Sequence, residues 1–155
     1  MRKFLLLLMF IVNIHKANSQ LTVAEWNFPG SASSIANSYS ITPNNSGKTI
    51  VTVGGTGPIN CVANSGAYSK SASCTGWDAG SGIKCWEIEF NTTGLYNLDV
   101  SSKQRSSTTG PKDWKVQYKI GMAGFYTDLP GATNIIVADD FTTVTGQVNQ
   151  VALPA

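Results

Sequence analysis

The sequence predicts an all-β protein made of antiparallel strands, and three observations support this prediction. Apolar and polar residues alternate with a period of two in several segments, which is typical of strands that bury one face. Stretches rich in glycine, asparagine and proline separate these segments and favour tight turns. No segment beyond residue 20 shows the 3.6-residue period of an amphipathic helix. Because each sheet would have one apolar face to cover, we expect an antiparallel β-sandwich.

The first twenty residues have the three parts of a secretory signal peptide. They begin with two cationic residues, continue with an apolar stretch, and end on small residues at the positions that a signal peptidase reads, Ala17 and Ser19. We expect a signal peptide over residues 1–19 and a single domain over residues 20–155. The mature chain is then secreted or held at the cell surface, and no later segment is apolar enough to span a membrane.

Removal of this signal changes the charge of the chain. The whole sequence has 11 basic and 9 acidic residues, a formal net charge of +2. Arg2, Lys3 and Lys16 lie in the signal, so the mature chain would carry a charge of about −1. A charge so close to neutrality argues against a nucleic-acid partner. His15 is the only histidine and is also removed, which excludes His-dependent catalytic triads and most zinc sites.

Two segments, 84–90 and 113–120, have the clearest strand alternation. The side chains expected to face inward are Trp86, Ile88, Phe90, Trp114, Val116, Tyr118 and Ile120. The residues between them are charged or polar, so both segments are predicted to be half-buried strands. Weaker strand signals cover residues 22–28, 39–41, 49–53, 96–102, 126–129, 135–138 and 147–153.

The chain has three cysteines, Cys61, Cys74 and Cys85. In an oxidising compartment two of them would tend to pair. Small and polar residues fill the segment between Cys61 and Cys74 and could form a loop that closes easily, so we predict a disulfide between these two. Cys85 is then a free, partly buried residue beside Trp86. A nucleophilic cysteine would lack its histidine partner, so none is expected to be catalytic.

Four neighbouring stretches carry a resemblance to a known module. They are KCWEIEF (84–90), NTTG (91–94), SSKQRSS (101–107) and TGPKDWKVQY (109–118). Together they resemble a recurrent β-sandwich module of exported bacterial proteins, which is similar to jelly-roll, carbohydrate-binding-like domains. The resemblance implies a jelly-roll-like sandwich over roughly residues 21–155 and an association with secreted, multidomain surface proteins.

Two departures from the module's pattern stand out. Cys85 occupies a position where the pattern has an aromatic residue, and the pattern continues beyond Ala155 through further strands. The tail that contains Val148, Val151 and Leu153 is apolar, although a free terminus is more often polar. We therefore expect the chain to be a piece of a longer protein whose last strands complete the sandwich.

Four residues are predicted to bind a ligand. Alternation directs Lys103, Arg105 and Gln117 outward, where they could donate hydrogen bonds to sugar hydroxyls or carboxylates. Trp77 lies in a loop rich in glycine and serine and could stack on a sugar ring. Two alternatives remain open. The polar side chains could be a solvated face paired with acids such as Glu87, and Trp77 could cover the core as a lid.

The predicted function is that of a non-catalytic extracellular module that binds a polysaccharide, a cell-surface glycan or a protein partner. The alternative is an N-terminal accessory domain of a secreted hydrolase or nuclease whose catalytic domain is not in this chain. The sequence has none of the common catalytic motifs, and Glu87 and Glu89 merely repeat along one strand pattern, so a paired-carboxylate hydrolase is not expected. No cofactor is expected. Asp139 and Asp140 could contribute to a calcium site, but two adjacent acids are more typical of a turn.

Overall fold

The computed structural model describes residues 21–63, 70–140 and 147–154 of the 155-residue chain. These residues confirm the predicted all-β class, because they form antiparallel strand pairs and one short 3-10 helix, η1 (Pro43–Asn45), but no α-helix. In the described part the strands form small two-stranded sheets rather than two extended ones. The predicted signal peptide lies outside the described residues.

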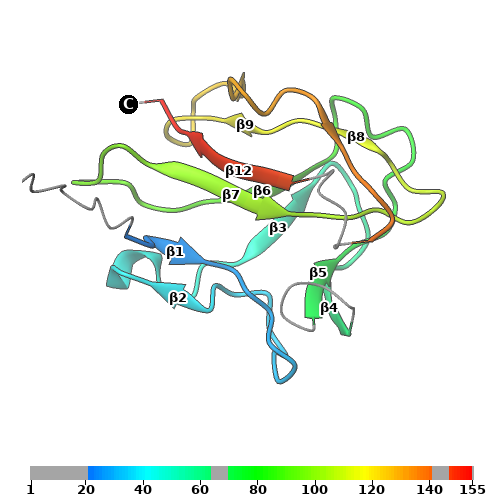
Figure 1. Cartoon of the computed structure of the whole chain (residues 1–155), viewed down its shortest axis with the longest axis horizontal. Coiled ribbons are helices and arrows are strands. Elements are labelled where there is room, and N and C mark those ends of the chain that lie inside the picture. The colour runs from blue at the N-terminus through cyan, green and yellow to red at the C-terminus, as the bar shows by residue number, and fades with distance from the viewer. Residues whose placement is uncertain (1–20, 64–69, 141–146, 155) are drawn as a thin grey trace, which may run out of the picture.

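The strands pair with both near and distant partners in the sequence. The pairs are β1 (Ala24–Glu25) with β2 (Tyr39–Ser40), β3 (Ile50–Val53) with β6 (Cys85–Ile88), β4 (Asn60–Ala63) with β5 (Lys70–Ser73), β7 (Asp99–Lys103) with β12 (Gln147–Ala152), β8 (Asp113–Trp114) with β11 (Ile135–Ile136), and β9 (Gln117–Tyr118) with β10 (Thr127–Asp128). Figure 1 shows β12 alongside β7 in the middle of the molecule, with β8 and β9 above them and β1, β2, β4 and β5 below.

The predicted strand over 113–120 is found as β8 and β9, which run in line along one long hairpin. Trp114 pairs with Ile135 and Tyr118 pairs with Thr127, so the returning chain is four residues longer than the chain it faces. The extra residues bulge out around Gly131, whose φ of +85° suits glycine. Backbone hydrogen bonds from Leu129 N to Val116 O and from Val116 N to Ala132 O hold the bulge in register.

The core lies between this hairpin and the β7–β12 pair. Its buried residues are Leu129, Ala132, Ile135, Val137 and Val148, and the half-buried Val100, Trp114, Val116, Tyr118, Val151 and Leu153 pack against them. The two ends of the bulge, Leu129 and Ala132, are thus core residues. Removing these apolar side chains from water is the main favourable contribution to folding here.

The inward alternation is confirmed for residues 114, 116 and 118 and wrong at two of the predicted positions. Ile120 is 74% exposed because β9 ends at Tyr118 and the hairpin tip begins there. Ile88 shares a face of β6 with Trp86, but it lies at the end of the strand and is exposed. Glu87, predicted to point into solvent, is half-buried.

The segment predicted as a flexible loop between two cysteines contains the hairpin β4–β5. Its register places Cys61 opposite Ala72, and Cys74 follows the end of β5. The predicted Cys61–Cys74 disulfide is not formed, since both cysteines are free. The Cys74 thiol instead donates a hydrogen bond to the carbonyl oxygen of Gly57, at 2.8 Å. Backbone pairing therefore organises this segment, without the apolar alternation that the sequence prediction relied on.

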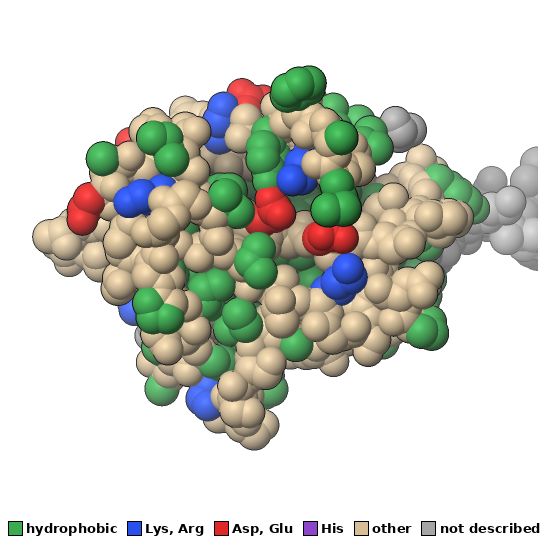
Figure 2. Space-filling model, turned by 180° about the vertical axis from the view of Figure 1, so that it is seen from behind, with side chains coloured by type: hydrophobic (Ala, Val, Ile, Leu, Met, Phe, Trp, Pro, Cys, Tyr) green, Lys and Arg blue, Asp and Glu red, His purple; other side chains and the backbone are tan. Residues whose placement is uncertain are grey.

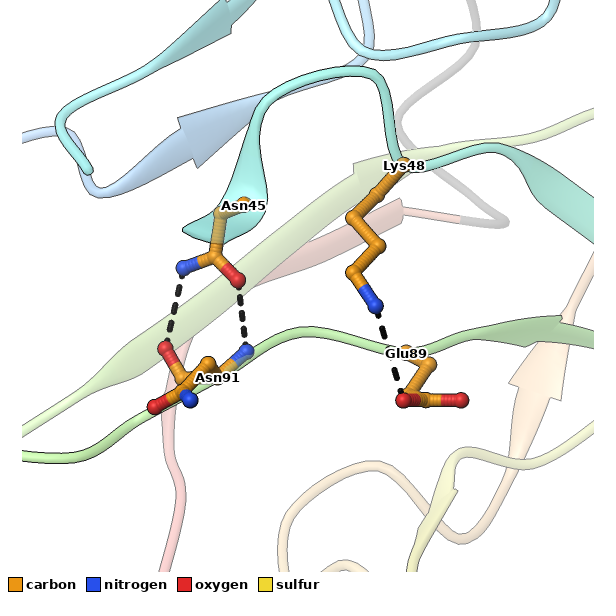
Figure 3. Close-up of polar contacts among 4 residues, drawn as sticks. All are labelled: Asn45, Lys48, Glu89 and Asn91. Atoms are coloured by element: carbon orange, nitrogen blue, oxygen red, sulfur yellow. Dashed lines mark hydrogen bonds and ion pairs between the residues drawn. The ribbon is translucent and has the colours of Figure 1, made fainter. Parts of the chain in front are cut away.

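A buried asparagine fastens η1 to the segment that follows β6. Asn45 is fully buried, and its side chain donates to Asn91 O at 2.9 Å and accepts from Asn91 N at 2.6 Å (Figure 3). Its own carbonyl oxygen accepts a hydrogen bond from the Asn37 side chain at 2.7 Å. Nearby, Lys48 and Glu89 form an ion pair at 3.5 Å. Asn45 thus acts like a short piece of strand, because its amide makes the same paired hydrogen bonds as a backbone.

Replacing Asn45 with alanine tests the contribution of its hydrogen bonds to Asn91. The Asn45→Ala variant should lower the free energy of unfolding by about 1–3 kcal/mol, because two backbone groups lose their partners. The matched control is Asn44→Ala, in the exposed neighbour within η1, which should stay within about 0.5 kcal/mol of the wild type. Urea unfolding followed by tryptophan fluorescence measures both. Equal stability of the two variants would contradict the assigned role.

Candidate functional site

The structure does not bring the four predicted ligand residues together. Trp77 contacts Trp86, Trp114 and Cys74, whereas Arg105 donates to Asp139 and Gln117 donates to Asp128. Lys103 is the exposed last residue of β7. Each of the others belongs to a separate cluster of side chains.

Trp77 is part of a cluster of three tryptophans. Its ring centroid lies 5.3 Å from that of Trp86 and 5.1 Å from that of Trp114, the latter in an edge-to-face arrangement. The indole N–H donates to Cys74 O at 2.9 Å. Lys84 holds the same loop by donating to the carbonyl oxygens of residues 76 and 78, both at 2.7 Å. Trp77 is half-buried and packs against Trp86 and Trp114.

Arg105 lies in a second cluster, near the end of the hairpin. Its guanidinium donates to Asp139 O at 3.0 Å, and the Asp139 carboxylate forms an ion pair with Lys112. These contacts join residue 139 to residues 105 and 112. Asp139 is thus engaged by cations, and the described residues include no cluster of three or more His, Cys, Asp or Glu side chains that could hold a metal ion.

Gln117 belongs to a polar surface on the β9–β10 hairpin. Alternation places Lys115, Gln117 and Lys119 on the face opposite the core, and Asp128 lies directly across from Gln117. Tyr126, two residues before Asp128, lies on the same side. We call these five residues the hairpin face. Lys115 Nζ and Gln117 Nε2 both donate to Asp128 Oδ1, each at 2.7 Å.

Glu87 of β6 contacts two other residues of the hairpin face, Tyr126 and Lys119. The Tyr126 hydroxyl donates a hydrogen bond to Glu87 Oε2, and Lys119 Nζ lies 3.6 Å from the same oxygen. The Lys119 ammonium also lies 4.8 Å from the centre of the Tyr126 ring, in a cation–π contact. Tyr126 remains 44% exposed. The hairpin face therefore combines a fixed, partly exposed aromatic ring with an amide, two ammonium groups and a carboxylate.

Two side chains of this region have shifted pKa values, Asp128 and Cys85. Hydrogen bonds from Lys115 and then Gln117 lower the pKa of Asp128. Burial, and then the charge of Glu87, raise the pKa of the Cys85 thiol, which keeps it in the unreactive protonated form. Glu87 and Glu89 form ion pairs with different cations, Lys119 and Lys48. Figure 2 shows acidic and basic side chains side by side among apolar ones on this part of the surface.

A second surface feature is an open depression of about 390 Å³ beside β1 and β2. It is lined by Leu21, Thr22, Glu25 and Tyr39. It is shallow and lies apart from all four predicted ligand residues. One tyrosine, one threonine hydroxyl and one carboxylate offer fewer polar groups than the hairpin face does.

The sequence pattern indicated Gln117, and one alternative paired its face with Glu87, but Tyr126 and Asp128 were not predicted as members of this surface. The period-two pattern placed Gln117 on the outer face correctly. The partners across the hairpin depend on the register, which a loop of this length does not fix. The glycines at 121 and 124 mark a turn, but they do not specify that Asp128 pairs with Gln117.

A scan against models of known protein families finds no match, and comparisons with curated proteins and solved structures find no significant similarity. No helix in the described ranges is long and apolar enough to cross a membrane. The geometry of the hairpin face and the chemistry of its side chains therefore carry the functional argument.

Titration of Asp128 tests the hydrogen bonds of the hairpin face. Its pKa should lie below the ordinary value of 3.8, because the ionised form accepts two hydrogen bonds. A pKa lower in the folded than in the unfolded state means that this contribution to stability is complete above pH 3.8 and is lost as the pH falls through the folded-state value. An NMR titration of the Asp128 carboxyl carbon measures it.

The variant Lys115→Met is the comparison for this titration, because it removes the group that lowers the pKa most. In that variant the pKa should rise towards 3.8. A wild-type pKa at or above this value, or no change in the variant, would show that the hydrogen bonds do not form in solution.

Proposed function

We propose that this chain is a non-catalytic carbohydrate-binding module and that a glycan binds to the hairpin face. The observation that carries the proposal is the partly exposed Tyr126 ring beside the hydrogen-bonding groups of Gln117 and Asp128. Sugars are recognised by this combination, because their rings have apolar faces and their edges carry hydroxyl groups.

The orientation of Tyr126 suits stacking on a sugar ring. Its hydroxyl is bound to Glu87, which fixes the ring before any ligand arrives. Lys119 lies over one face of the ring, so a sugar would stack on the other face. A fixed aromatic side chain loses little conformational entropy on binding, and the contact is therefore more favourable.

The polar groups of the hairpin face suit sugar hydroxyls. A hydroxyl both donates and accepts hydrogen bonds. Gln117 offers an amide oxygen and an amide N–H, Lys115 offers N–H donors, and Asp128 offers carboxylate oxygens. All three lie on paired strands rather than on a long loop, which keeps their spacing constant.

The sequence resemblance to carbohydrate-binding-like modules points to the same class of ligand. The N-terminal signal pattern predicts that binding takes place outside the cell. Within the proposal, the module acts alone or as the accessory domain of a secreted hydrolase or nuclease, where it would keep a catalytic domain near its substrate.

A second candidate function, contact with a protein partner, is favoured by the tip of the same hairpin. Ile120, Met122 and Phe125 are all strongly exposed there. Apolar and aromatic side chains exposed together are common at protein interfaces. This tip lies next to the hairpin face. Substitutions at the tip therefore distinguish contact with a protein partner from glycan binding.

The test of glycan binding is calorimetric titration against a panel of soluble polysaccharides. The wild type should bind at least one of them, and Tyr126→Ala should weaken that binding about tenfold, which corresponds to about 1.4 kcal/mol. Tyr126→Phe keeps the ring but loses its hydrogen bond to Glu87, so it should bind less tightly than the wild type and more tightly than Tyr126→Ala.

Two controls accompany this test. Tyr96→Ala removes a tyrosine that is 83% exposed and lies outside the hairpin face, so it should not change the affinity. Phe125→Ser should change contact with a protein partner without loss of glycan binding. Failure to bind any polysaccharide, or equal affinity of the Tyr126→Ala variant, would exclude the proposed site.

A further inference from the structure

The charges on the hairpin face cancel one another in pairs. Lys115 is matched by Asp128 at 2.7 Å, and Lys119 is matched by Glu87 at 3.6 Å. Each ammonium thus has its own carboxylate, and the surface offers a ligand hydrogen-bonding groups but little net charge. This feature bears on which class of glycan the proposed site would accept, and the inference rests on the proposed function.

The Lys119–Glu87 pair is less exposed to solvent than the Lys115–Asp128 pair. The side chains of Lys119 and Glu87 are 28% and 25% exposed, compared with 45% and 47% for Lys115 and Asp128. Charges that are partly removed from water interact more strongly than charges in bulk solvent. A ligand carboxylate beside Tyr126 would therefore lie close to the Glu87 carboxylate. It would also find the Lys119 ammonium already paired.

An anionic sugar would also find no dedicated partner on this surface. Arginine binds carboxylates in a bidentate geometry, but none of the five hairpin-face residues is an arginine. Arg105 donates to Asp139 in a different cluster. To bind an acidic sugar, the site would have to break an existing ion pair, and that cost offsets the gain.

We propose that the hairpin face selects neutral, hydroxyl-rich glycans and discriminates against glycans that carry carboxylates. The matched ion pairs fix the polar groups around Tyr126, and because each ammonium is already paired with a carboxylate, an acidic ligand finds no free cation. Binding should consequently depend little on salt, because salt screens attraction between opposite net charges and none is used here.

The experiment compares a neutral galactomannan with polygalacturonate on the same protein. The wild type should bind the galactomannan at least about tenfold more tightly than the polygalacturonate, and its affinity should change little between low and high salt. Glu87→Gln keeps an acceptor for the Tyr126 hydroxyl and removes one charge, and Asp128→Asn removes the other. In the double variant the preference should shrink to about threefold or reverse, and binding to polygalacturonate should become sensitive to salt.

Two further variants make the result interpretable. Glu89→Gln removes one negative charge, as each single substitution does, but it unpairs Lys48, which lies outside the hairpin face, so it should leave the preference unchanged. Asp128→Asn alone alters an exposed side chain and should shift the preference partway even if the double variant unfolds. Melting curves of every variant verify the fold.

The outcomes separate this inference from the proposed function. A wild-type preference that is lost in the double variant and kept in Glu89→Gln supports the inference. Equal or tighter binding of polygalacturonate by the wild type overturns it and leaves glycan binding intact. A preference that survives in the double variant, or changes equally in Glu89→Gln, shows that the ion pairs do not set selectivity. Absence of binding to both polysaccharides overturns the inference, and the proposed function is rejected with it when no other member of the polysaccharide panel binds either.

Discussion

The alternation of two adjacent residues in β6 is the constraint on which both the core and the candidate site depend. Trp86 points to the face where it packs against Trp77, which in turn contacts Trp114. Glu87 points to the opposite face, where it binds Tyr126 and Lys119. A slip of one residue in the pairing of β6 with β3 would exchange the two side chains, place a carboxylate among indole rings, and release the hairpin. One strand thus links packing on the inside to the hairpin face on the outside.

Small sheets need such links, because a two-stranded ribbon is only marginally stable by itself. In the described part of the chain the connections are made by a few side chains of specific geometry. Asn45 replaces a stretch of backbone pairing beside β6, the tryptophan cluster joins β6 to β8, and Glu87 joins β6 to the β9–β10 hairpin. Polar contacts of this kind have directional requirements that apolar packing lacks, so they define the arrangement as well as stabilise it.

Sequence patterns predicted what depends on local periodicity and missed what depends on distant register. The outer position of Gln117 and the inner position of Trp114 follow from alternation and were predicted correctly. The partners of Gln117 and the half-buried state of Glu87 arise from contacts between strands that are far apart in the sequence. The β4–β5 hairpin was missed because its strands carry mostly small and polar side chains, and backbone pairing leaves no periodic signal in those. Trp77 shows a related difficulty, since a glycine-rich loop does not reveal whether its aromatic residue faces the core or the solvent.

The proposal that a glycan binds to the hairpin face is tested most directly by mapping the contact residue by residue. A two-dimensional NMR titration with a neutral oligosaccharide should shift the signals of Gln117, Tyr126 and Asp128 together, with one common dissociation constant. Signals from the depression around Tyr39 should stay in place. Shifts that gather at Tyr39 or at Trp77, with the hairpin face unaffected, would contradict the claim and move the site elsewhere on the molecule.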